Sequence, residues 1–234
     1  MSEDLALGLG AVPSPPDLRD FRLELPAAAP PLPYRYQARS MPPVLYQGAT
    51  PTCVGHAGVT VKAWEERRDP SWARFLPFDP FWLYRRCKAT DGIPPAEGTY
   101  PRAALAILLK EGAQLRGAAA PNRRLRIAAY YRVPVDVESM KRAIVAYGPL
   151  LVATRWSRSW FRPVDGRLPD PTTDAGGHAF MIYGWNDKIG PGSWIARNSW
   201  GRAWGVRGDF YLRYALWTAA GPEAWKALDV IGDR

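Results

Sequence analysis

The residue pattern of this chain changes from helical to strand-like near residue 149, and this change limits the folds that it can adopt. Before that point, four stretches have the spacing and the end signals of helices, at residues 53–68, 79–89, 101–110 and 136–147. After it, short β-branched or aromatic runs lie between Gly, Pro and Asp turns, at residues 150–154, 178–185, 194–198 and 209–213. Helices first and strands later predict an α+β fold with segregated halves.

The composition is that of a globular protein. The 234 residues are 47% hydrophobic, which is enough for a core, and two Cys cannot form a disulfide scaffold. The net charge of +9 comes from scattered Arg, so we expect a solvated basic surface and no obligatory nucleic acid, with an acidic partner or an anionic membrane as the minor alternative. The longest apolar run, residues 103–109, is too short to span a bilayer, and no export signal is visible. A cytoplasmic or otherwise reducing compartment is expected, with secretion by a non-classical route left open.

The first 42 residues form a Pro-rich arm. Nine of the 24 Pro lie at or before Pro43, residues 5–10 are short and broken by Gly, and the globular part is expected to start near Val44. The alternation over residues 21–25 predicts a strand with one buried face that adds to a sheet edge. The alternative is a disordered tail.

Cys53 is the candidate nucleophile. It stands at the predicted start of the first helix, behind Thr52 as the expected N-cap, where free backbone N–H groups and the helix dipole lower the pKa of a thiol. The alternative is a small buried apolar residue. The base that thiol chemistry needs must be one of two His. His178 follows a Gly pair and precedes an apolar strand, whereas His56 lies deep in a small-residue helix and fits a core position better.

Two amides complete the candidate site. Asn198 lies twenty residues after His178 and can accept a hydrogen bond from the imidazole, which Trp200 can screen from water. Gln47 precedes Cys53 by six residues and can donate to an oxyanion beside the backbone N–H of Cys53.

In their order and spacing, these four residues resemble the papain family of cysteine peptidases. The block from Asn198 to Gly208, Asn-Ser-Trp-Gly-Arg-Ala-Trp-Gly-Val-Arg-Gly, carries the same resemblance. The resemblance implies a papain-like two-lobed fold, with an active-site cleft between a mainly helical lobe (residues 43–120) and a mainly β, barrel-like lobe (residues 121–234). It makes Cys53 the nucleophile, His178 the base and acid, Asn198 the orienting residue and Gln47 the oxyanion-hole side chain.

The same resemblance indicates three residues that bind substrate. Glu97-Gly98-Thr99 resembles the glycine-bearing wall that pairs with the substrate backbone, so Gly98 is assigned there. Gly177 and Trp200 are placed beside the substrate by their positions next to His178 and Asn198. Part of the arm is expected to lie near the cleft.

The chain also departs from the family pattern. Thr50 stands where the family usually has a Cys, and Val54 stands where it has an aromatic residue, so the usual disulfide cannot form and Cys87 is expected to be a free structural thiol. These departures fit the prokaryotic or viral branches of the family. Only 52 residues precede Cys53, so the long inhibitory pro-region common in the family is not expected.

The function expected from the resemblance is that of a thiol endopeptidase acting on peptide or protein substrates through an acyl-enzyme. The alternatives are a transpeptidase or amide ligase on the same site, and a non-catalytic binding protein on a peptidase fold. No cofactor is implied, and no metal, because two Cys and two His lack zinc-site spacing. The sequence leaves the substrate preference, the oligomeric state and any gating by the arm open.

Overall fold

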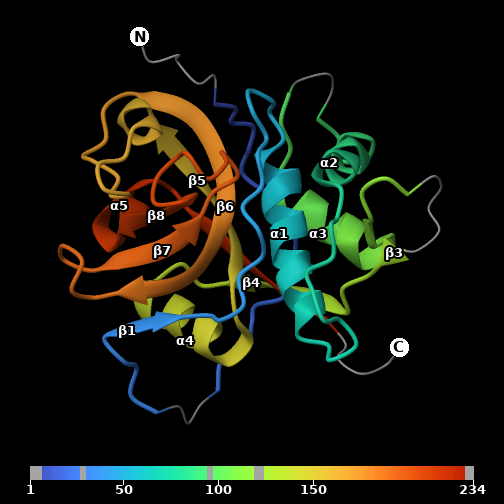
Figure 1. Ribbon diagram of the computed structural model, residues 1–234, viewed down its shortest axis with the longest axis horizontal. Helices are drawn as coiled ribbons and strands as arrows, with labels where there is room; N and C mark the ends of the chain where they lie inside the picture. Colours follow the sequence, from blue (N-terminus) through green and yellow to red (C-terminus); the bar gives the residue numbers. More distant parts are fainter. Residues whose placement is uncertain (1–6, 27–29, 94–96, 119–123, 230–234) are drawn as a thin grey trace.

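A computed structural model describes residues 7–26, 30–93, 97–118 and 124–229 of the chain. Three helices, α1 (Cys53–Arg67), α2 (Pro80–Lys88) and α3 (Pro101–Lys110), lie together on one side of the molecule, and α1 lies between the other two and the main sheet (Figure 1). The predicted helices therefore begin and end within a residue or two of the observed ones.

The main sheet has seven strands, and every ladder in it is antiparallel. Its order is β4-β9-β5-β6-β7-β8, with β1 also paired to β6. The strands are β1 (Arg35–Gln37), β4 (Ala129–Val133), β5 (Leu150–Ser157), β6 (Asp174–Asn186), β7 (Ser193–Arg197), β8 (Asp209–Arg213) and β9 (Glu223–Leu228). Two short strands, β2 (Ala113–Gln114) and β3 (Arg124–Leu125), pair separately, while α4 (Val137–Tyr147), η1 (Arg158–Phe161) and α5 (Tyr214–Ala219) complete the described elements. The α+β prediction is confirmed, whereas the division into lobes at residue 120 remains a prediction.

Local signals explain three of the helix starts. Asp79 caps α2 through the backbone N–H groups of Phe81 and Trp82, and Asp136 caps α4 through that of Ser139. Pro101 occupies the first turn of α3, where its missing N–H is not needed. Thr52 stands at the N-cap position of α1, as predicted, and its carbonyl oxygen accepts from the His56 backbone N–H at 3.0 Å. Its backbone, at φ −105° and ψ 17°, is not extended, and its side chain makes no capping hydrogen bond.

Small residues let α1 pack closely against its neighbours. A Cβ on Gly55 would lie 2.4 Å from the carbonyl oxygen of Pro80, at the start of α2. Thirteen of the fifteen residues of α1 are buried, so the helix is enclosed on nearly all sides. This enclosure fixes the position of its first residue, Cys53.

The parts of the arm that the structure describes, residues 7–26 and 30–42, pack on the globular body. Tyr36 of β1 pairs with Trp185 of β6, so the prediction that the globular part starts near Val44 is wrong. The predicted strand over residues 21–25 is reduced to one bridge, between Arg22 and Arg132 at the edge strand β4. Leu23 is buried there, but Phe21 is 69% exposed, because a single bridge does not hold both side chains on the covered face.

Candidate active site

Cys53 and His178 come from the two halves of the molecule. Cys53 is the first residue of α1 and is fully buried, and His178 is a buried residue of β6. The backbone N–H of Ala179, the residue after His178, interacts with the Cys53 thiol. Packing of α1 against β6 therefore brings the predicted nucleophile to the strand that carries the predicted base, at the residue next to it.

Asn198 determines which imidazole nitrogen carries the proton. Its Oδ1 lies 2.7 Å from Nε2 of His178 and also accepts a hydrogen bond from the Ser199 backbone N–H at 2.8 Å. An amide oxygen only accepts, so Nε2 of His178 is the protonated nitrogen. The other nitrogen, Nδ1, is buried and has no hydrogen-bond partner among the described residues. It is the nitrogen available to take a proton.

Two indoles hold the imidazole in place. Trp200 stacks on it with ring centroids 4.5 Å apart and an interplanar angle of 25°, as its predicted screening role requires. Trp156 of β5 meets it edge to face at 4.8 Å. The sequence analysis missed Trp156, because the strand predicted there ended at Thr154 and no sequence signal gives the pairing of β5 with β6.

Gln47 is held with its amide group fixed. Its Oε1 accepts a hydrogen bond from the Ser199 hydroxyl at 2.6 Å, so its Nε2 must face the other way. That Nε2 donates to the carbonyl oxygens of Thr50, at 2.8 Å, and Gly8, at 3.1 Å. The Gly8 carbonyl thus occupies the position to which the predicted oxyanion-hole side chain donates.

Residues 8–12 of the arm pass through this site as an extended segment. The backbone N–H groups of Gly10 and Ala11 both donate to the Gly177 carbonyl at 3.0 Å. On the opposite side, Thr99 donates to Gly10 at 2.9 Å and accepts from Val12 at 3.0 Å, in a parallel bridge. The segment also reaches Trp200, whose indole N–H donates to the Gly8 carbonyl at 3.0 Å.

All three residues predicted to bind substrate contact this segment. Besides Gly177 and Trp200, Gly98 lies so close that a Cβ on it would be 2.5 Å from the Gly10 carbonyl oxygen. The prediction that part of the arm lies near the cleft therefore holds for residues 8–12. The sequence analysis had described these residues only as short and broken by Gly.

The covered site is electrically neutral. Burial raises the pKa of Cys53 to about 12, outweighing the backbone N–H groups that favour the thiolate, and burial lowers the pKa of His178 to about 4. The low thiol pKa expected at a helix start is thus wrong for this arrangement, because the segment excludes the water that would solvate a thiolate.

The other His and the other Cys are core residues. Nδ1 of His56 lies 3.0 Å from the Thr52 carbonyl oxygen, and burial lowers the pKa of this histidine to about 4. Cys87 is a buried free thiol whose pKa is also raised by burial. Within the described ranges, no group of three or more His, Cys, Asp or Glu is arranged to hold a metal ion, and no helix is long and apolar enough to cross a membrane.

The site combines a thiol at a helix start, an imidazole oriented by an amide, and a second amide. These are the groups that nucleophilic thiol chemistry requires. The model of the papain family cysteine proteases matches residues 97–219, just over half of the chain. The chain belongs to this family. The matched region contains His178 and Asn198, while Cys53 and Gln47 lie before it.

Individual relatives agree with this assignment. Cathepsin 7 of Rattus norvegicus is 29% identical over 142 residues, 57% of this chain and 40% of the relative. A gut-specific cysteine proteinase of Caenorhabditis elegans is 32% identical over 83 residues, 35% of this chain and 25% of the relative. The chain thus spans between a quarter and two-fifths of the length of these relatives.

Solved structures confirm the papain-like fold over almost the whole chain. Xylellain, a cysteine protease from Xylella fastidiosa, superposes with a TM-score of 0.82 at 22% identity, covering 98% of this chain and 99% of that one. Procathepsin B of Trypanosoma congolense gives a TM-score of 0.78 at 16% identity, covering 96% and 87% of the two chains. At these identities the likeness concerns the fold.

Proposed function

We propose that this protein is a thiol-dependent endopeptidase. Cys53 attacks the carbonyl carbon of a peptide bond while Nδ1 of His178 takes the thiol proton, and the imidazolium then gives that proton to the leaving amine. Water hydrolyses the acyl-enzyme, with His178 again acting as base. Asn198 keeps the imidazole in the tautomer that leaves Nδ1 free, and Gln47 and the backbone N–H of Cys53 stabilise the oxyanion.

One observation carries this proposal: the geometry around the Gly8 carbonyl. This carbonyl oxygen accepts a hydrogen bond from Gln47, while the backbone of Ala11, in the same segment, interacts with the Cys53 thiol. On its two sides the segment pairs with the backbone of Gly177 and Thr99. Backbone pairing of this kind suits an extended peptide of variable sequence. The substrate class that it supports is peptide or protein.

The segment over residues 8–12 makes the proposed enzyme latent. It occupies the groove that a substrate needs, and it is followed by anchoring contacts: Ser14 donates to Glu223 at 3.0 Å, and Asp20 pairs with Arg102 at 3.1 Å. Activity then requires this segment to leave.

We assign the chain to a prokaryotic or viral branch of the family, acting in a cytoplasmic or otherwise reducing compartment. The two cysteines are free, and Thr50, where the family usually has a half-cystine, hydrogen-bonds to Thr52 at 2.7 Å instead.

The test, like every peptide assay of a site variant below, uses the full chain carrying Gly10→Ala, because an added Cβ there would lie 2.3 Å from the Pro51 carbonyl oxygen and is expected to displace the segment. Cys53→Ala and Cys87→Ala are compared in this background. Cys53→Ala is expected to abolish hydrolysis without unfolding the protein, and Cys87→Ala to retain most of it. Hydrolysis that survives Cys53→Ala would refute the proposal. Adding an amine nucleophile separates the alternative, because a transpeptidase forms the amide product in preference to the acid.

A further inference from the structure

We propose that Trp156 is a positioning residue for His178, which clamps the imidazole against Trp200 and separates the His178–Asn198 hydrogen bond from the pocket on its other side. The proposal rests on the proposed function, since a clamped imidazole matters only if His178 transfers protons. Trp156 itself touches neither substrate nor reacting atoms.

The register of the sheet sets the contact. Thr154 of β5 pairs with His178 of β6, and Trp156 pairs with Gly176. Side chains two residues apart on a strand lie on the same face, so Trp156 and His178 form a diagonal pair across the two strands, within reach of an aromatic side chain. Because Gly176 has no side chain, the indole is free to lean toward His178, where the ring centroids lie 4.8 Å apart at 69°.

The two indoles hold different sides of the imidazole. The Trp200 ring stacks on the imidazole, with an angle of 25° between the two ring planes. The Trp156 ring is almost perpendicular to that of Trp200, with an interplanar angle of 88° and ring centroids 5.3 Å apart. Rotation of the imidazole about its side-chain bonds is therefore blocked by one ring face and one ring edge. Nε2 is kept pointing at Oδ1 of Asn198, 2.7 Å away.

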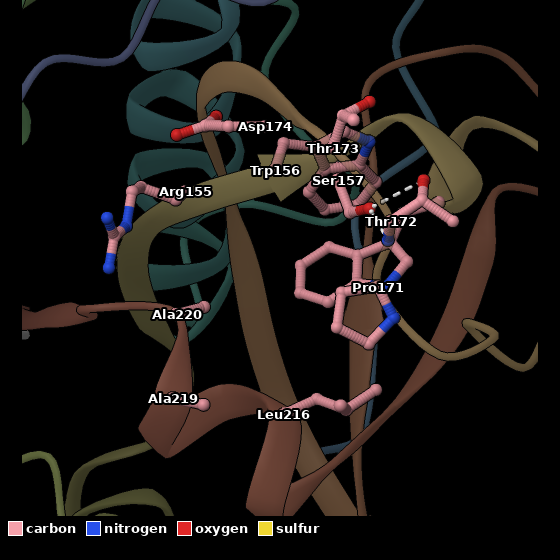
Figure 2. Close-up of a pocket in the computed structure, with 11 residues that line it drawn as sticks. Arg155, Trp156, Ser157, Pro171, Thr172, Thr173, Asp174, Leu216, Ala219 and Ala220 are labelled. Atoms are coloured by element: carbon pink, nitrogen blue, oxygen red, sulfur yellow. Dashed lines mark hydrogen bonds between the residues drawn. The ribbon is translucent and has the colours of Figure 1, made fainter.

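Trp156 also forms a wall of a pocket. The pocket has a volume of about 190 Å³. In Figure 2, Trp156 lies near Ser157 and Thr172, and Leu216 and Ala219 lie on the opposite side of the pocket. Arg155 and Asp174 lie at its rim, and the neighbouring cavity along residues 11–14 of the arm shares both of them. Trp156 therefore lies between a pocket next to the peptide groove and the catalytic hydrogen bond.

The indole nitrogen of Trp156 makes no hydrogen bond. Its Nε1 is buried and, like that of Trp194, has no hydrogen-bond partner among the described residues, whereas the indole nitrogens of Trp160, Trp200 and Trp204 donate to backbone carbonyls. An unsatisfied buried donor is unfavourable and calls for an explanation. The ring of Trp156, not its N–H, is what the site uses.

The test compares Trp156→Leu with Trp160→Leu. Trp160 is the matched control: it is 2% exposed, lines the same pocket and contacts Trp156 at 5.3 Å, but it makes no ring contact with His178. Both variants lose a buried indole, so a purely structural role would affect them alike. Trp156→Phe keeps an aromatic ring and serves as the rescue variant if Trp156→Leu folds poorly.

Two readouts apply, and the first needs no peptidase activity. The chain has only two His, so proton NMR of the His56→Asn background isolates the Nε2–H of His178. In Trp156→Leu that proton is expected to exchange with water at least tenfold faster, and in Trp160→Leu to stay unchanged. In peptide hydrolysis, kcat is expected to fall tenfold or more with KM within about twofold, and Trp156→Phe to recover most of it.

The outcomes separate the two proposals. Equal proton exchange and equal kcat in Trp156→Leu and Trp160→Leu would overturn the positioning role while leaving the peptidase intact. A protein that hydrolyses no peptide in the Gly10→Ala background, once alkylation of Cys53 shows that the segment has left, would overturn the proposed function. The proton exchange would still decide whether Trp156 clamps and screens His178.

Discussion

The Gly8 carbonyl oxygen accepts a hydrogen bond from Nε2 of Gln47 at 3.1 Å, and this contact links the start of the chain to its proposed oxyanion hole. It places the arm's own backbone where the backbone of a substrate would bind. Four predictions follow from the way this segment, the two histidines and a buried ion pair are held.

Gly10→Ala is expected to displace the segment and activate the protein. Gly10 has φ 131°, and a Cβ there would lie 2.3 Å from the Pro51 carbonyl oxygen, so the backbone must shift. Iodoacetamide should then label Cys53 at least tenfold faster, and peptide turnover should rise. Gly117→Ala is the control, because its φ is 74° but no atom lies within 4 Å of the added Cβ. Equal labelling of the two variants would show that the segment does not block the thiol.

The two histidines are expected to respond differently to removal. His178→Ala should lower kcat by several orders of magnitude, as the loss of a general base in a coupled triad does. His56→Asn should mainly lower the free energy of unfolding, because Nδ1 of His56 is engaged by Thr52. Steady-state kinetics measure the loss of kcat, and denaturant unfolding measures the loss of stability. A large loss of kcat in His56→Asn but not in His178→Ala would identify His56 as the base.

Stability is expected to fall as the pH drops from about 6.5 to about 4. Burial lowers the folded-state pKa of both His56 and His178 to about 4 from 6.5, so in this window the unfolded chain binds more protons than the folded one. Each histidine can contribute about 3 kcal/mol over the full window. The same linkage favours displacement of the segment over His178, because opening hydrates that ring.

Denaturant unfolding across this pH range measures the change in stability. The rate of Cys53 alkylation, corrected for the pH dependence of the reagent's own reaction, measures the displacement of the segment. His56→Asn should remove roughly half of the pH dependence of unfolding and leave that of alkylation unchanged. A free energy of unfolding that is flat between pH 6.5 and pH 4 would contradict the prediction.

Lys226→Met is expected to destabilise the protein by about 3–5 kcal/mol, the typical cost of leaving one member of a buried ion pair alone. Lys226 and Glu65 form a salt bridge in which both side chains are fully buried, and Lys226 also donates to the Pro149 carbonyl at 3.2 Å. Adding Glu65→Leu should restore part of the loss, because it removes a buried carboxylate whose remaining ion pair is with Arg68, a partly exposed residue 3.2 Å away. The exposed Lys110, replaced by Met, is the control in denaturant unfolding, and an equal effect of the two Lys replacements would contradict the prediction.

Local signals account for the helices that the sequence predicted correctly. Asp79, Pro101 and Asp136 mark helix starts through interactions within one turn, and Gly148 follows the end of α4. Strand positions were found in the same way for β5 to β8, but β1, β4 and β9 were missed. β1 lies in the arm, β4 lies at the sheet edge, and β9, which pairs on both sides with β4 and β5, contains no β-branched residue.

The identities of the candidate catalytic residues also came from the sequence. Cys53, His178, Asn198 and Gln47 are separated along the chain by intervals that gain meaning from comparison with a known family. The structure connects them: Asn198 binds His178, Ser199 binds Gln47, and the Cys53 thiol interacts with the backbone of Ala179. Their chemical roles remain predictions that the variants above test.

Tertiary structure alone decided three things: the diagonal contact of Trp156 with His178, the path of residues 8–12 through the groove, and the neutral state of the covered thiol and imidazole. Register between β5 and β6 depends on the hydrogen bonds of two distant strands, and the path of the arm depends on backbone groups of Gly177 and Thr99 that every residue type shares. Protonation depends on which atoms exclude water. The sequence determined which nucleophile, base and amide side chains the site can use, because the chemistry of a side chain is set by its residue type. The distances between these side chains and their exposure to water arise only when remote segments of the chain pack together.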